Sequence, residues 1–144
     1  MKLKKMAGVL LAAVLMFAQG VMAQPVLAMD ARSSNGAVVA PKWANVSDVL
    51  LSLSFANGVA SCDGAVFGYS GTTKISATLT LERKNTNGIY TYVDSWSTNA
   101  NSSQLFVSGT ASVASGYTYR LRISANVTRN GSVENISVSI EKKY

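Results

Sequence analysis

From residue 43 onward, apolar and polar residues alternate with a period of two in one segment after another. The clearest alternation runs over Lys74–Glu82 (KISATLTLE), and the same spacing recurs over Tyr117–Arg129. Successive side chains of an extended strand point to opposite faces, so this period is typical of strands with one buried face. The 3.6-residue period of an amphipathic helix is absent from this region. The alternation therefore predicts an all-β fold.

Turn residues divide this region into seven expected strands. Asn57-Gly58 and Asn130-Gly131 are Asn-Gly pairs, which are the strongest short-range signal for a β-hairpin. The expected strands are Leu51–Phe55, Val59–Tyr69, Lys74–Glu82, Ile89–Ser97, Gln104–Thr110, Tyr117–Arg129 and a last one through Ile136, Val138 and Ile140. The second strand is irregular at Asp63-Gly64, where a bulge is plausible. The polar stretch Thr98–Ser103 is expected to form a loop.

Each of these strands carries one apolar face, which has to be buried against another layer. The strands follow one another about every ten residues, as in β-sandwiches. Two antiparallel sheets packed face to face satisfy this requirement. We therefore predict a single antiparallel β-sandwich of about seven strands, with a small closed barrel as the alternative.

The first 23 residues have the features of a cleavable signal peptide. A basic start (MKLKK) precedes the apolar run Ala7–Phe17, and Gln19–Ala23 resembles a small-residue cleavage site. The apolar run is shorter than the ~20 residues that a membrane span needs. We expect cleavage before Gln24, with a second candidate site before Met29. The expected organisation is a leader over 1–23, a flexible lead-in over 24–42 and a β-sandwich over 43–144, in a secreted protein with no membrane attachment after the leader is removed.

Removing this leader changes the charge of the protein. Three of the thirteen Lys and Arg residues leave with it, so ten basic residues face seven acidic ones and the net charge falls from +6 to +3. The remaining positive charges are scattered, apart from Arg83-Lys84 and Lys142-Lys143. Such a weak net charge does not favour a nucleic-acid partner.

Residues with catalytic or metal-binding chemistry are sparse. The sequence contains no histidine, which excludes Ser-His-Asp triads, Cys-His dyads and histidine metal sites. The seven acidic residues show no calcium-loop pattern, and there is no glycine-rich phosphate loop. We expect neither an enzyme nor a bound cofactor or metal. The single cysteine, Cys62, is either a reactive thiol or a small buried apolar residue, and burial is the favoured interpretation.

Three aromatic residues on one expected strand are the candidate ligand-binding residues. In an extended strand Tyr90, Tyr92 and Trp96 project on one face together with Asp94. Aromatic rings beside a carboxylate are suited to stacking on sugar rings or to docking a peptide. The competing interpretation is that these rings belong to the core, where large aromatic residues are common. A bulge that turns both Val93 and Trp96 inward is a further alternative.

The segment Ser115–Ala125 (SGYTYRLRISA) resembles the penultimate strand of a fibronectin type III or immunoglobulin-like domain. In such domains a tyrosine at this place forms a corner, because its hydroxyl bonds backbone a few residues upstream. The resemblance assigns that role to Tyr119. The Cys…Trp…Cys pattern of antibody-type domains is missing from this chain.

The region from about residue 45 to 144 also resembles a group of small exported proteins of unknown function from Gram-positive, clostridial-type bacteria. The shared features are a cysteine in the second strand, Gly68–Ile75 (GYSGTTKI), the residues Leu79, Leu81 and Arg83-Lys84, and Val93–Ser97 (VDSWS). The resemblance implies a secreted β-sandwich and supplies no activity.

These observations predict a non-catalytic binding module that recognises an extracellular or cell-surface glycan or protein through one sheet face or its loops. The alternative is a structural, self-associating extracellular protein that joins its neighbours through sheet edges or through an accessible Cys62. The sequence leaves the identity of the partner and the oligomeric state open.

Overall fold

The structure is a computed structural model that describes residues 42–144. Its seven strands are β1 (Val46–Ala56), β2 (Val59–Gly68), β3 (Thr72–Lys84), β4 (Tyr90–Ala100), β5 (Gln104–Ser112), β6 (Thr118–Arg129) and β7 (Ser132–Lys143). The expected leader, and the expected lead-in except for Lys42, lie outside the described residues, so both stay predictions. No helix within residues 42–144 is long and apolar enough to cross a membrane.

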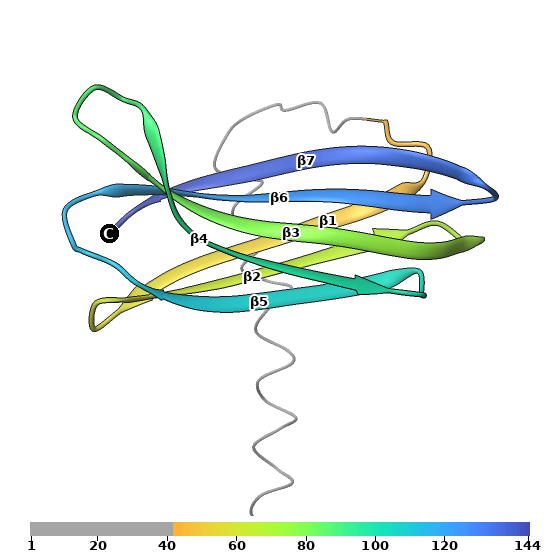
Figure 1. Cartoon of the computed structure of the whole chain (residues 1–144), viewed down its shortest axis with the longest axis horizontal. Coiled ribbons are helices and arrows are strands. Elements are labelled where there is room, and N and C mark those ends of the chain that lie inside the picture. Colours follow the sequence, from red (N-terminus) through yellow and green to blue (C-terminus); the bar gives the residue numbers. More distant parts are fainter. Residues whose placement is uncertain (1–41) are drawn as a thin grey trace, which may run out of the picture.

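The strands form two sheets that stack face to face (Figure 1). One sheet has three strands in the order β1-β2-β5, and the other has four in the order β4-β3-β6-β7. Every neighbouring pair is antiparallel. The all-β, antiparallel sandwich of immunoglobulin or fibronectin III type is therefore confirmed. The sheets stay open, with β1 and β5 at the edges of one and β4 and β7 at the edges of the other.

Two local expectations are wrong. Asp63 and Gly64 pair in regular register with both β1 and β5, so β2 has no bulge there. The expected loop over Thr98–Ser103 shrinks to residues 101–103, because β4 runs on to Ala100 and pairs with the buried Ile75 of β3. Polar residues on a solvent-facing edge strand give no apolar signal, which is why the sequence alone placed this boundary too early.

The two Asn-Gly pairs form the tight hairpin turns that the sequence predicts. Asn57 and Gly58 have φ values of 51° and 75°, and Asn130 and Gly131 have values of 50° and 76°. Two consecutive positive φ angles are what a type I′ turn requires, and the twist of that turn matches that of the strands. These turns set the β1–β2 and β6–β7 pairings.

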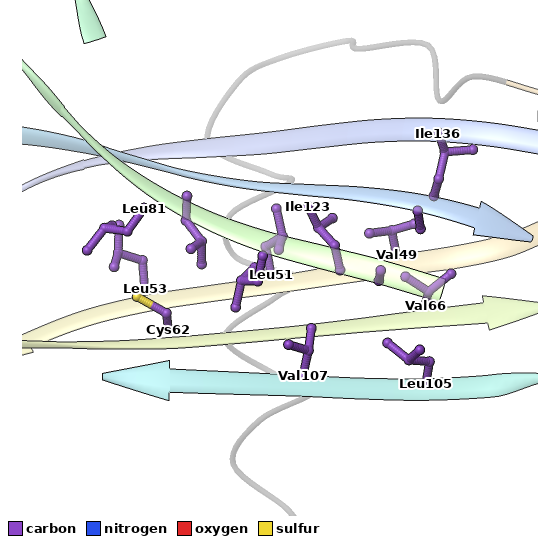
Figure 2. Close-up of a cluster of buried hydrophobic side chains, with 14 of the residues drawn as sticks. Val49, Leu51, Leu53, Cys62, Val66, Leu81, Leu105, Val107, Ile123 and Ile136 are labelled. Carbon is purple, nitrogen blue, oxygen red and sulfur yellow. The ribbon is translucent and has the colours of Figure 1, made fainter. Parts of the chain in front are cut away.

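The core lies between the inner faces of the two sheets (Figure 2). Leu51 and Leu53 of β1 meet Leu81 of β3 and Ile123 of β6, and all four side chains are buried. Cys62 of β2 lies among them with 1% of its surface exposed. Burial, with smaller contributions from nearby Asp63 and Asp94, raises the pKa of the Cys62 thiol to about 12. The favoured interpretation of Cys62 as a buried apolar residue is confirmed.

Tyr119 forms the corner that its resemblance to fibronectin-like domains implies. Its ring is 1% exposed, and its hydroxyl donates to the carbonyl of Ala114 at 2.8 Å. The same hydroxyl accepts from the Ala114 amide at 3.0 Å. Ala114 lies in the connection that crosses from β5 in one sheet to β6 in the other, so these bonds help to hold the sheets together.

Candidate functional site on the outer face of the four-stranded sheet

Trp96 points between the two sheets. It pairs with Leu79, whose side chain is fully buried, and it packs against the core. The indole lies over Gly109 of β5, where an added Cβ would be only 2.0 Å from its Cε2 atom. Gly109 thus leaves room for the indole, which covers the side of the sandwich where β4 faces β5.

A bulge in β4 separates Trp96 from the two tyrosines. Tyr92 pairs with Glu82 and Asp94 pairs with Leu81, which leaves Val93 without a partner on β3. One extra residue reverses the faces on which the following side chains lie. The expectation that all three aromatic rings share one face is therefore wrong. The alternative bulge, with Val93 and Trp96 both packed inward, is the observed arrangement.

Tyr90 lies on the outer face but is already engaged. The guanidinium carbon of Arg120 lies 4.0 Å from the centre of its ring, and its hydroxyl donates to Glu141. Arg120 Nε in turn donates to Glu82 at 2.7 Å, and Arg122 donates to the other oxygen of Glu82 at 3.2 Å. Desolvation, together with the hydrogen bond to Glu141, raises the pKa of Tyr90 to about 12. The cluster spans four strands and covers one face of the ring.

Tyr92 is the candidate aromatic residue with a free ring. Its side chain is 66% exposed, and its hydroxyl shares a hydrogen bond of 3.2 Å with Ser95 Oγ. This contact directs the Tyr92 ring along β4, toward the uncharged polar side chains of the same sheet face. Of the three predicted ligand-binding residues, Tyr92 alone presents an open aromatic surface.

Beyond Tyr92 and one intervening row, Ser95–Thr80–Arg122–Ser139, the outer face consists of two rows of uncharged polar side chains that cross all four strands. One row contains only hydroxyl groups and the other contains three amides and one hydroxyl. The rows are Ser97–Thr78–Ser124–Ser137 and Asn99–Ser76–Asn126–Asn135. At a strand spacing of about 4.8 Å, each row is about 14 Å long.

These rows line an open hollow of about 670 Å³. Every residue that lines it is uncharged. Thr78 and Ser97 share a hydrogen bond of 2.7 Å, whereas the other six polar side chains of the two rows form none with described residues. The hollow therefore offers hydrogen-bond donors and acceptors that the fold itself does not use.

The sequence analysis did not single out these polar residues. Their signal was present, because serine, threonine and asparagine occupy the polar positions of several alternating segments. Such residues ordinarily indicate a solvent-facing side. Only the strand order brings residues as far apart as Ser76 and Asn135 into one row.

The outer face of the three-stranded sheet has a different character. Leu50, Ala65 and Phe106 form one apolar row across its three strands, and the Phe106 side chain is 65% exposed. Phe67 packs edge-on against Phe106, with ring centres 5.8 Å apart. Asp63 lies on the same face next to this row, and burial raises its pKa.

Groups that bind metals do not gather within residues 42–144, where no cluster of three or more His, Cys, Asp or Glu side chains is found. Glu82, the most buried carboxylate, is held between Arg120 and Arg122. No described residues therefore form an evident metal site.

Comparisons with known proteins add little. No protein-family profile matches the chain, and no curated protein is significantly similar to it. Among solved structures, the solution structure of CsgH from R. palustris is similar, with 13% identity over 65% of this chain and 90% of that chain, at a TM-score of 0.37. A similarity this weak says nothing about function. The resemblance to a family of clostridial-type exported proteins stays a prediction.

Proposed function

We propose that this chain is an exported, non-catalytic binding module that recognises an uncharged glycan outside the cell. The observation that carries the proposal is the uncharged polar hollow, which shares the outer face of the four-stranded sheet with the exposed ring of Tyr92. Export rests on the signal-peptide pattern of residues 1–23, which also favours a bacterial, secreted protein.

The chemistry of the hollow matches that of a neutral sugar. Sugar hydroxyls both donate and accept hydrogen bonds, as serine and threonine hydroxyls and asparagine amides do. Ligand sites combine a few converging polar groups with an apolar or aromatic surface. Ser124 and Asn126 at the centre of the sheet supply polar groups, and Tyr92 at its edge supplies an aromatic surface. The absence of charged groups from the lining favours an uncharged ligand.

Co-sedimentation tests this proposal directly. The purified protein is mixed with cellulose, chitin or insoluble β-1,3-glucan, and the bound fraction is measured against ligand concentration. We expect one of these polysaccharides to retain the protein. Tyr92→Ala is expected to weaken that binding at least tenfold, and Ser124→Lys, which places a bulky charge in the hollow, is expected to abolish it.

Phe106→Ala is the matched control, because Phe106 is as exposed as Tyr92 but lies on the opposite sheet. It is expected to bind like the wild type. If Phe106→Ala weakens binding as much as Tyr92→Ala does, the hollow is not the site. Failure of all three polysaccharides to retain the wild type rejects the proposal for these glycans.

A self-associating structural protein is the second candidate function, and the apolar row Leu50–Ala65–Phe106 favours it. Exposed apolar surface of this kind marks many protein interfaces. The covalent version of this candidate, through Cys62, is disfavoured because that thiol is buried. Sedimentation velocity over a range of concentrations distinguishes the two candidates, since Phe106→Ser removes self-association but leaves glycan binding intact.

A further inference from the structure

The strand order brings together two basic pairs that are far apart in the sequence. Arg83 of β3 and Lys142 of β7 both pair with Tyr119 of β6, so they lie in one row on either side of that strand. Lys84 and Lys143 follow them by one residue each. At about 4.8 Å per strand spacing, the two pairs are roughly 10 Å apart. In Figure 1 the β3–β4 turn and the end of β7 lie at the same end of the molecule.

We call the end defined by Arg83, Lys84, Lys142 and Lys143 the cationic end. The net positive charge of the described domain is concentrated there. With the neighbouring Arg120 and Arg122 this end has six basic side chains against two acidic ones, Glu82 and Glu141, a net charge of +4. All described residues together have nine basic and six acidic side chains, a net charge of +3. The rest of the described domain is therefore slightly negative, at −1.

The two acidic residues do not neutralise the four cations that define this end. Glu82 accepts hydrogen bonds from Arg120 and Arg122, and Glu141 accepts one from Tyr90. None of the four defining cations forms an ion pair with a described carboxylate. Like charges in adjacent rows repel each other, so this arrangement costs the fold free energy.

Contacts hold Arg83 and Lys142 in place without neutralising their charge. The guanidinium of Arg83 lies 4.6 Å from the ring centre of Tyr117, which positions it by a cation–π contact. Lys142 Nζ donates one hydrogen bond to the Leu53 carbonyl at 3.1 Å and keeps its charge. Lys143 is exposed. Donors that are positioned in advance lose less conformational entropy when a ligand binds.

We propose that the cationic end is a second binding site, separate from the uncharged hollow, for a linear polyanion that bears phosphate or sulfate groups. Arg83 and Lys142 share the face of Tyr119, and Lys84 and Lys143 lie on the other face of the same sheet end. A linear polymer that passes over this end, unlike a single ion in a pocket, contacts cations about 10 Å apart with several of its groups at once. The connection that projects beside them, residues 85–89 (NTNGI), is polar except for the exposed Ile89, and a single apolar side chain favours a soluble polymer over insertion into a membrane.

Binding of long-chain inorganic polyphosphate and of dextran sulfate, measured by isothermal titration calorimetry at several salt concentrations, tests this inference. The wild type is expected to bind at least one of them at about 0.15 M salt. Lys84→Gln/Lys143→Gln is expected to weaken binding at least tenfold and to lower the slope of log affinity against log salt by about 2. The preferred polymer tells whether phosphate or sulfate is the better ligand.

Lys42→Gln/Lys74→Gln is the matched control, because it removes the same charge from the opposite end of the domain. It is expected to keep the affinity and salt slope of the wild type. Equal losses in both double variants would mean that only net charge attracts the polymer, and would overturn the proposal. Failure to bind either polymer would also overturn the proposal. So would binding to vesicles of phosphatidylglycerol and phosphatidylcholine that is tighter than binding to either polymer and is abolished by Ile89→Ser.

Thermal unfolding separates this binding role from a structural one. If the cationic end serves a ligand, Lys84→Gln/Lys143→Gln keeps or raises the Tm at low salt, since it relieves repulsion. A lower Tm in that variant would indicate that the lysines stabilise the fold. The glycan assay is independent of this test, because neither lysine lines the hollow.

Discussion

The two sheets of this domain have similar inner faces and opposite outer faces. Both inner faces are aliphatic and meet in one core. The strands of the three-stranded sheet contain two acidic residues and no basic ones, and their outer face has an apolar row in which Phe106 is exposed. The strands of the four-stranded sheet contain eight basic and four acidic residues, and their outer face is polar.

This difference between the outer faces indicates where a functional site should be sought. Folding requires the inner faces to be apolar, because burial of apolar surface is the main driving force. It places no such demand on outer faces, where most substitutions change stability by less than about 0.5 kcal/mol. A consistent difference between the outer faces is therefore not required by folding. The following experiments test how sharply inner and outer faces differ.

Thiol labelling should give the largest contrast, because Ser61 and Cys62 are neighbours on opposite faces of β2. Burial raises the pKa of Cys62 from 9.0 to about 12, which lowers its thiolate fraction at pH 8 about a thousandfold. Native Cys62 should react with a disulfide reagent at least that much more slowly than the unfolded chain. Ser61→Cys in a Cys62→Ser background should react rapidly, and comparable native rates would contradict the buried position.

Truncating a core side chain should lower the free energy of unfolding by a similar amount in either sheet. Leu53→Ala in the three-stranded sheet and Leu79→Ala in the four-stranded sheet each remove a buried side chain. Each should lower the free energy of unfolding by about 2–5 kcal/mol, measured by urea denaturation. The outward-facing controls Ser52→Ala and Thr80→Ala should change it by less than about 0.5 kcal/mol. A small effect at Leu53 alone would show that the three-stranded sheet is dispensable.

Removing one hydroxyl should weaken the link between the sheets. Tyr119→Phe keeps the buried ring but leaves the Ala114 carbonyl and amide without their partner. The expected loss is about 1–3 kcal/mol in the same denaturation assay. Tyr92→Phe, on the outer face, is the control and should be nearly neutral. If the two variants lose the same stability, the corner contributes nothing specific.

The smallest effect is expected at Asp63, a half-buried carboxylate in a sheet without basic residues. Burial raises its pKa above the usual 3.8, so the folded protein holds the proton more tightly than the unfolded chain. Stability is therefore lost as the pH rises from 3.8 through the raised value. Asp63→Asn should gain up to about 0.5 kcal/mol at pH 7 and nothing at pH 3. An equal gain at both pH values would assign the effect to packing.

Most of the fold could be predicted from the alternation of apolar and polar residues and from the turn residues. All seven strands and both Asn-Gly hairpins follow from patterns within about a dozen neighbouring residues, and the corner at Tyr119 follows from the resemblance of Ser115–Ala125 to fibronectin-like domains. The candidate site was harder to predict, because the Val93 bulge depends on how β4 pairs with β3. That bulge turns Trp96 into the core and leaves Tyr92 outside.

The sequence by itself determined that the chain forms strands, where most of them turn, and which side of most of them is buried, with β4 as the exception. These properties are local, since strand period and turn conformation depend on adjacent residues. Only the tertiary structure decided which strands are neighbours, and thereby placed Ser76 beside Asn126 in the hollow and Arg83 in the row of Lys142. Pairings between distant strands depend on how the whole core packs, and no local pattern encodes that.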